Sequence, residues 1–173
     1  MANSRKVAVV GASGVVGRAL VEHLIQGEIP VVGLSRRPPA DLADAPFQPL
    51  DLTSPSECEQ IAESTLSDVT HLVYTALFEK PGLISGWQEQ DQMQTTLAML
   101  RNLLEPLKTS GKLRHVTLLQ GTKAYGAHVK PMKIPGLESD PRHLHENFYW
   151  LQEDYLRDLC SGTDLQFTIW RPQ

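Results

Sequence analysis

Short apolar runs alternate along this chain with segments in which apolar residues recur every three or four positions. The runs are typical of buried strands, and the periodic segments are typical of helices with one buried face. The runs predict strands at residues 6–10, 31–34, 47–50, 70–75, 113–119 and 165–170. The periodic segments predict helices at residues 15–26, 55 onward, 93–107 and 148–159. Strand and helix therefore follow one another from one end of the chain to the other.

Local signals mark the ends of two of these helices. Gly27 and Pro30 follow the helix at residues 15–26, in the order in which glycine and proline usually end a helix. Residues 54–57 (Ser-Pro-Ser-Glu) form a capping box with proline at the first helical position, so we expect a helix to begin at residue 55.

Strands separated by helices imply right-handed crossovers between parallel strands. The expected fold class is α/β: a doubly wound parallel sheet of about six strands with helices on both faces. In such sheets ligands bind beyond the carboxyl ends of the strands. The loops that follow the strands therefore hold the candidate chemistry.

Length and composition narrow the class of protein. The chain has 173 residues, 41% hydrophobic and 21% charged, which suits one globular domain and excludes a disordered chain, a collagen-like repeat and a coiled coil. The net charge of −4 comes without a block of like charges, so we expect no nucleic-acid partner.

The sequence predicts neither a disulfide nor a metal site. Cys58 and Cys160 lie far apart without ligand spacing, and His143 and His145 lack a third ligand. With no apolar segment of transmembrane length, we expect no membrane association and a cytoplasmic location.

A glycine-rich loop connects the first predicted strand to the first predicted helix. Residues 11–17 read Gly-Ala-Ser-Gly-Val-Val-Gly. In such a loop the first glycine permits a tight turn, the second lets the backbone approach a pyrophosphate, and the third lets the helix pack closely on the sheet. The helix dipole favours the bound anion. This context predicts an NAD(P)-binding Rossmann fold with a set of loop residues that bind the cofactor: Gly11, Ser13, Gly14, Val15 and Gly17. The glycine spacing resembles that of the extended short-chain dehydrogenase/reductase family.

The residues after the second predicted strand indicate which dinucleotide is bound. An acidic residue there would bind a ribose 2′-hydroxyl, whereas Ser35, Arg36 and Arg37 offer guanidinium groups that suit a 2′-phosphate. We therefore expect NADPH or NADP in preference to NAD; solvated surface arginines are the alternative. Further cofactor-binding candidates follow the third and fourth predicted strands: Asp51, Leu52 and Thr75. The first of these either lies where relatives contact the adenine ring or serves a turn.

The usual short-chain catalytic signature, a tyrosine followed four residues later by a lysine, is missing from the sequence. Tyr149 is followed by Glu153, and Tyr125 by Val129. Two other segments stand out instead. Residues 121–126 (Gly-Thr-Lys-Ala-Tyr-Gly) follow the fifth predicted strand, and residues 147–154 (Asn-Phe-Tyr-Trp-Leu-Gln-Glu-Asp) open the last predicted helix.

Together with Pro-Arg at residues 141–142 and Trp-Arg-Pro at residues 170–172, these segments resemble the progesterone 5β-reductase/iridoid synthase-like family. The resemblance covers nearly the whole chain. It implies that Lys123 and Tyr149 are the catalytic residues. Ala124 and Trp150 depart from the family, which usually has histidine and a second tyrosine there, and this points to a different substrate pocket.

The resemblance implies an NADPH-dependent oxidoreductase that reduces the activated C=C bond of an enone or enal. Hydride would reach the β-carbon while Tyr149 hydrogen-bonds the carbonyl oxygen. Lys123 would lower the pKa of the phenol and hold the nicotinamide ribose. Without the resemblance, Tyr149 and Trp150 could equally be packing aromatics, and Lys123 a surface lysine.

Two other functions remain open at this point. The same scaffold could serve carbonyl reduction or sugar-nucleotide chemistry, or it could be a non-catalytic NADP(H)-binding redox sensor. Extended members of the family are considerably longer, so we expect residues 1–173 to be the NADP(H)-binding Rossmann domain without the C-terminal substrate-binding part. The partner would be a small-molecule substrate, and a homodimer stays open.

Overall fold

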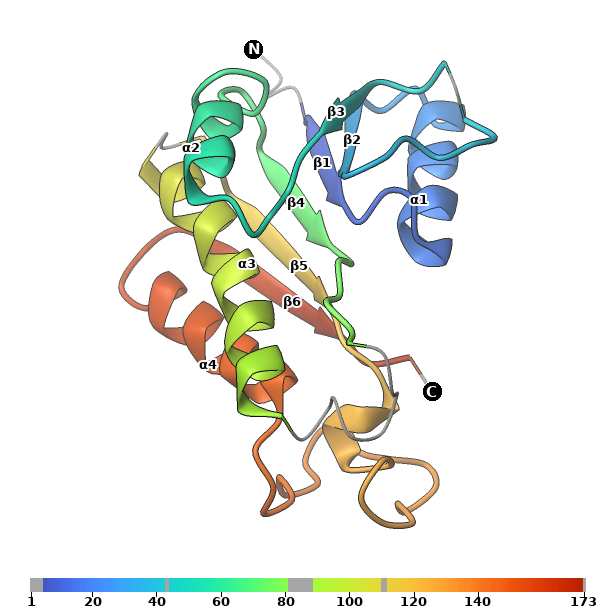
Figure 1. Cartoon of the computed structure of the whole chain (residues 1–173), viewed down its shortest axis with the longest axis vertical. Helices are drawn as coiled ribbons and strands as arrows, with labels where there is room; N and C mark the ends of the chain where they lie inside the picture. Colours follow the sequence, from blue (N-terminus) through green and yellow to red (C-terminus); the bar gives the residue numbers. More distant parts are fainter. Residues whose placement is uncertain (1–4, 43, 81–88, 110–111, 173) are drawn as a thin grey trace.

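The computed structural model describes residues 5–42, 44–80, 89–109 and 112–172. Within them six parallel strands form one sheet in the order β3-β2-β1-β4-β5-β6, the order of a Rossmann sheet (Figure 1). The strands are β1 (Val7–Val10), β2 (Val31–Ser35), β3 (Phe47–Pro49), β4 (His71–Tyr74), β5 (His115–Leu119) and β6 (Gln166–Trp170). The helices are α1 (Val15–Gln26), α2 (Pro55–Glu63), α3 (Gln90–Thr109) and α4 (Phe148–Cys160). The expected doubly wound α/β fold is confirmed.

The predicted elements differ from the observed ones mainly at their ends. Helix α3 begins at Gln90 and keeps Pro106 within its last turn, so it is longer than the apolar periodicity indicated. The capping box before α2 is half formed: Ser54 accepts a hydrogen bond from the Glu57 N–H. The Glu57 carboxylate binds the N–H of Asp51 instead, at 3.2 Å. A short 3₁₀ helix, η2 (Thr122–Tyr125), was not predicted.

Strand β1 lies at the centre of the sheet and is buried on both faces. Ala8 and Val10 belong to the larger core, which the sheet shares with α2, α3 and α4. Val7 and Val9 face the opposite way, into a smaller core with α1. Figure 1 shows this division, with α1 apart from the row formed by α2, α3 and α4. Burial on both faces explains why the strand has an unbroken apolar run rather than an alternating one.

The start of α1 lies directly on the turn that follows β1. Gly11 has a φ of +88°, in the left-handed region that favours glycine. A side-chain carbon built on Gly17 would lie 2.2 Å from the carbonyl oxygen of Gly11, far inside van der Waals contact. The helix can therefore approach the turn this closely only because residue 17 has no side chain.

We expect Gly17→Ala to lower the free energy of unfolding by about 1–3 kcal/mol, because the added methyl group must push α1 away from the turn. Urea unfolding followed by circular dichroism measures the change. Gly27→Ala, at the other end of α1, is the control: its new carbon would lie 3.4 Å from the His23 carbonyl oxygen, in ordinary contact. Equal destabilisation by the two substitutions would contradict the packing role of Gly17.

Candidate functional site

A cleft of about 720 Å³ opens at the carboxyl ends of the first four strands in the chain. This volume lies within the usual range of small-molecule and cofactor sites. Nine of the predicted cofactor-binding residues line it: Gly11, Ser13, Gly14, Ser35, Arg36, Arg37, Asp51, Leu52 and Thr75. Several lining residues were not predicted, among them Ala76, Leu77, Phe78 and Met99. These four supply an apolar wall that follows β4 and borders α3.

Two predicted cofactor-binding residues do not line this cleft. Gly17 is buried beneath the turn, where it makes the close contact with Gly11. Val15 is the first residue of α1 and is 88% exposed. The turn itself is held in place, since the N–H groups of Gly11 and Ala12 both bond to the Leu34 carbonyl of β2.

The first turn of α1 is suited to an anion. Its N-cap residue, Gly14, has no side chain to cap the helix, and the first turn contains no acidic residue. The partial positive charge of the helix N-terminus is therefore not neutralised by the chain itself. Because Ser13 and Gly14 line the cleft, this charge is available to a phosphate bound there.

Where the cleft borders the ends of β2 and β3, it is lined by two arginines and by a carboxylate that hydrogen bonds hold in place. Arg36 and Arg37 are exposed, and the Ser35 hydroxyl donates to the Arg37 carbonyl at 2.7 Å. Thr53 donates its N–H and its hydroxyl to Asp51 Oδ1, at 2.9 and 2.7 Å. These bonds, with a smaller effect of the nearby Arg36 charge, lower the pKa of Asp51. The ionised Asp51 thus caps its own turn, and it also lines the cleft.

Lys123 and Tyr149 lie beyond this cleft and are brought together by one buried side chain. Lys123 is on η2, and Tyr149 is in the first turn of α4. Asn147, which is 1% exposed, donates from Nδ2 to the Lys123 carbonyl at 2.7 Å. Its Oδ1 accepts the Tyr149 N–H at 2.9 Å. The residue that caps α4 therefore also joins the two segments that the sequence singled out.

The phenol of Tyr149 lies over Gly121, just ahead of η2. A side-chain carbon built on Gly121 would be 3.7 Å from the phenol oxygen. Burial is the main cause that raises the pKa of Tyr149, to about 12, and the charge of Glu79 adds to the effect. The phenol is consequently protonated at neutral pH in this structure.

Glu79 is the residue of this site that the sequence analysis missed. Its Oε1 is 3.6 Å from Lys123 Nζ. Burial lowers the pKa of Lys123, and the Glu79 charge opposes this effect. The next residue, Lys80, donates its N–H to the fully buried Gln92 at 2.9 Å, which anchors the loop after β4. The sequence does show an acidic residue in a loop that follows a predicted strand. It does not show which basic residue lies next to that acid in the fold.

The two departures from the family pattern lie against each other. The Trp150 indole N–H donates to the Ala124 carbonyl at 3.3 Å, and both residues are buried. The Trp150 ring also packs on His143, with ring centroids 4.1 Å apart. A small residue on η2 thus accompanies a large one on α4. Trp150 thus connects α4 both with η2 and with the loop before α4.

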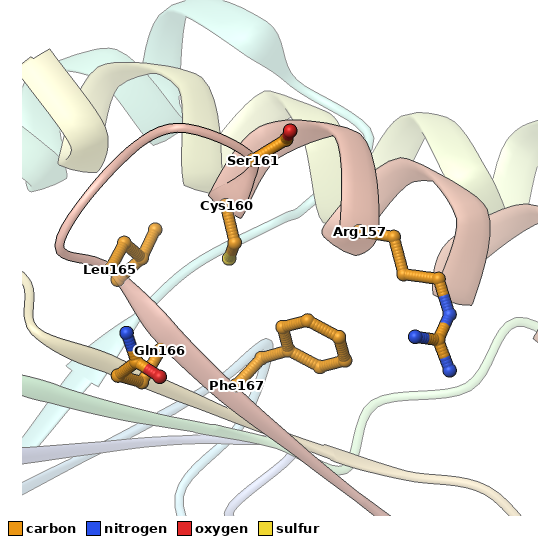
Figure 2. A pocket seen from close by; sticks show the side chains of 6 residues that line it. All are labelled: Arg157, Cys160, Ser161, Leu165, Gln166 and Phe167. Atoms are coloured by element: carbon orange, nitrogen blue, oxygen red, sulfur yellow. The ribbon is translucent and has the colours of Figure 1, made fainter.

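A second hollow, of about 340 Å³, lies at the opposite edge of the sheet, between the end of α4 and the start of β6. Figure 2 shows the Cys160 sulfur pointing into the space between helix and strand, with the Arg157 guanidinium near the Phe167 ring. Burial raises the pKa of the Cys160 thiol, so the thiolate is disfavoured. This hollow contains none of the residues that the sequence singled out for binding or catalysis.

The described part of the chain offers neither a candidate metal site nor a candidate membrane span. None of its His, Cys, Asp and Glu side chains gather in a group of three that could hold a metal ion. No described helix is long and apolar enough to cross a bilayer.

The chain is similar to proteins of one family. The profile of the NAD dependent epimerase/dehydratase family matches residues 7–172. An (S)-8-oxocitronellyl enol synthase of Catharanthus roseus is 32% identical over 178 residues, which are 95% of this chain and 43% of the relative. A 3-oxo-Δ(4,5)-steroid 5-β-reductase of Arabidopsis thaliana is 33% identical over 181 residues, 95% of this chain and 44% of the relative. The chain thus spans less than half the length of these curated relatives, and the resemblance stated from the motifs is confirmed.

Solved structures agree on the fold. A UDP-glucose 4-epimerase matches 97% of this chain and 51% of its own, with a TM-score of 0.79 and 16% identity. A short-chain dehydrogenase/reductase superfamily protein from Agrobacterium tumefaciens with bound NAD matches 96% of this chain and 48% of its own, with a TM-score of 0.76 and 19% identity. At these identities the likeness concerns the fold alone.

We expect Glu79→Gln to lower the pKa of Tyr149 by about one unit, because a negative charge that opposes ionisation of the phenol is removed. The measurement places 3-fluorotyrosine at position 149, where fluorine lowers the phenol pKa into a range in which the protein stays folded. The ¹⁹F chemical shift is then followed against pH. Glu89→Gln is the control, since it removes the same charge from a pair with Lys80. An unchanged midpoint in Glu79→Gln would show that burial alone sets the pKa.

Proposed function

Because the chain belongs to the NAD dependent epimerase/dehydratase family, we propose that it binds NADPH in the cleft beyond the first strands and uses it to reduce the activated C=C bond of an enone or enal. The observation that carries the proposal is the bridge made by Asn147 between the Lys123 carbonyl and the Tyr149 N–H. It joins the two segments whose combination marks the reductase relatives. The names of those relatives, an enol synthase and a steroid 5-β-reductase, fit this chemistry.

The residues of the cleft fit a phosphorylated dinucleotide. The uncapped first turn of α1 and the close glycine turn suit the pyrophosphate. Arg36 and Arg37 suit a 2′-phosphate, and Asp51 and Leu52 border the space for the adenine ring. We assign residues 1–173 this NADP(H)-binding part and place the substrate-binding part of such a reductase outside them. The curated relatives are more than twice as long as the segment that matches.

When bound, NADPH supplies the hydride that adds to the β-carbon of the substrate. As that bond forms, the π electrons of the C=C bond move toward the carbonyl and give an enolate oxygen. The protonated phenol of Tyr149 donates a hydrogen bond to this oxygen, and a proton from the phenol or from water then completes the saturated product. Lys123 adds a positive charge close to the developing enolate and binds the nicotinamide ribose.

Substitution of Tyr149 by Phe, in a protein that also contains the substrate-binding part, tests this role. We expect enone-dependent oxidation of NADPH to fall by about 100-fold or more, because the donor to the enolate is lost. The affinity for NADPH, measured by its fluorescence, stays unchanged. Tyr125→Phe is the control, since the Tyr125 ring packs beneath the Arg171 guanidinium at 5.6 Å and keeps that contact as Phe. Equal turnover in Tyr149→Phe and the parent would overturn the role of the phenol.

The substrate series separates this proposal from its alternatives. A cyclic enone and the matching saturated ketone are offered in parallel, each with NADPH and with NADH. Oxidation of NADPH with the ketone alone would support carbonyl reduction. Tight NADPH binding with no turnover of either compound, in a protein that also contains the substrate-binding part, would support a redox sensor.

Arg36 and Arg37 carry the proposed choice of cofactor. We expect Arg36→Gln with Arg37→Gln to weaken NADPH binding by about 10- to 100-fold, the usual value of charge-assisted hydrogen bonds to a phosphate. Binding of NADH should change little, because it has no 2′-phosphate. Arg101→Gln removes an arginine that packs on Tyr155 outside the cleft and serves as the control. An equal loss for both cofactors would contradict the assignment.

A further inference from the structure

We propose that Arg171 is a positioning residue for Tyr149 and that it acts through Gln120 and Glu153. Its effect on turnover rests on the proposed reductase function, whereas its effect on the orientation of Tyr149 can be measured without turnover. Arg171 follows β6, Gln120 follows β5, and Glu153 is in α4. The proposed chemistry gives none of them a direct part.

The first connection runs through the side chain of Gln120. This residue follows β5 and is 3% exposed. Its Oε1 accepts a hydrogen bond from Arg171 Nε at 2.8 Å, and its Nε2 donates to the Tyr149 carbonyl at 2.9 Å. The Gln120 N–H also bonds to the Trp170 carbonyl at 2.7 Å, so the sheet itself holds Gln120 beside Arg171.

The second connection reaches α4 one turn later. Glu153 is 4% exposed, and its Oε2 accepts a hydrogen bond from the Arg171 guanidinium. Its Oε1 accepts one from Arg157 at 2.8 Å. Burial favours the neutral carboxyl, yet these two arginines outweigh it and hold the pKa of Glu153 below its usual value. Glu153 is thus an ionised anchor inside the fold.

The two connections support the same face at the start of α4. Residues 149 and 153 lie four apart and so share one face of the helix. Asn147 holds the N-terminal end of the helix, and core packing of Leu156 and Leu159 holds its inner face. The Arg171 guanidinium adds support on the other face: it binds Glu153 directly and reaches the Tyr149 carbonyl through Gln120. The face with Tyr149 is thereby turned toward the carboxyl ends of β5 and β6, where Gly121 and Lys123 lie.

The neighbouring arginines provide a comparison within the same cluster. Arg142 forms two hydrogen bonds with Asp154, at 2.9 and 2.7 Å, and lies 3.5 Å from Glu153. Arg157 binds Glu153 from the exposed side of the same helix. Neither has a hydrogen bond to Gln120 among the contacts of the described residues, and Glu153 keeps both if Arg171 is replaced. Loss of Arg171 therefore removes the positioning contact without leaving a buried carboxylate unpaired.

The test compares Arg171→Met with Arg157→Met, each with 3-fluorotyrosine at position 149. Both substitutions remove a guanidinium from the same carboxylate, but only the first disconnects Gln120. We expect Arg171→Met to shift or broaden the ¹⁹F signal and Arg157→Met to leave it unchanged. In the assay with NADPH and a cyclic enone, Arg171→Met should lower kcat about tenfold or more with KM for NADPH within about twofold, because a small misplacement of a catalytic group is costly.

A second variant tests the proposal independently if Arg171→Met fails to fold. Gln120→Glu keeps an oxygen that accepts from Arg171 and replaces the amide that donates to the Tyr149 carbonyl. We expect it to shift the ¹⁹F signal as well. A parental ¹⁹F signal in either Arg171→Met or Gln120→Glu would overturn the proposal, even if turnover fell. A shifted signal in a protein that turns over no enone would support the positioning role while contradicting the proposed function.

Discussion

All strands of the described sheet run in the same direction, and this constraint brings the residues of the site together. Because each pair is parallel, every loop that follows a strand emerges at the same edge. The glycine turn after β1, the arginines after β2 and Asp51 after β3 meet at one cleft there. The loop after β4 runs from that cleft to Glu79, whose partner Lys123 follows β5. Residues as far apart in the sequence as Gly11 and Thr75 are thus brought together by the pairing of the strands.

The hydrogen bonds of two buried side-chain amides then define how the residues around Tyr149 are arranged. Asn147 and Gln120 are almost fully buried, and each uses both atoms of its amide group for hydrogen bonds. A buried polar group that loses its partner costs about 1–3 kcal/mol, so such side chains tolerate few arrangements of their neighbours. Both amides bond to the backbone beside Tyr149, one at its N–H and the other at its carbonyl. The tyrosine is thereby held by its main chain from two sides.

Much of the fold could be predicted because its signals are local. The apolar run at Val7–Val10 and the glycines that follow it specify a strand, a turn and a helix within about twenty residues. The site was only partly predictable, since motifs identified Lys123 and Tyr149 but not what surrounds them. Glu79 lies 44 positions before Lys123, and no spacing rule connects the two. The η2 helix was missed for a similar reason: four residues are too few for a periodic pattern, and tertiary contacts such as that of Asn147 stabilise it.

The electrostatics of the site favour a phenol that donates rather than accepts a proton. Burial and the Glu79 charge both disfavour the phenolate of Tyr149, while the Glu79 charge opposes the lowering of the Lys123 pKa by burial. A tyrosine that begins an oxidation as a base must be ionised, which needs a lowered pKa. A tyrosine that stabilises an enolate must instead stay protonated until negative charge appears on the substrate. The raised pKa of Tyr149 agrees with the second role, the one that the proposed reduction assigns to this residue.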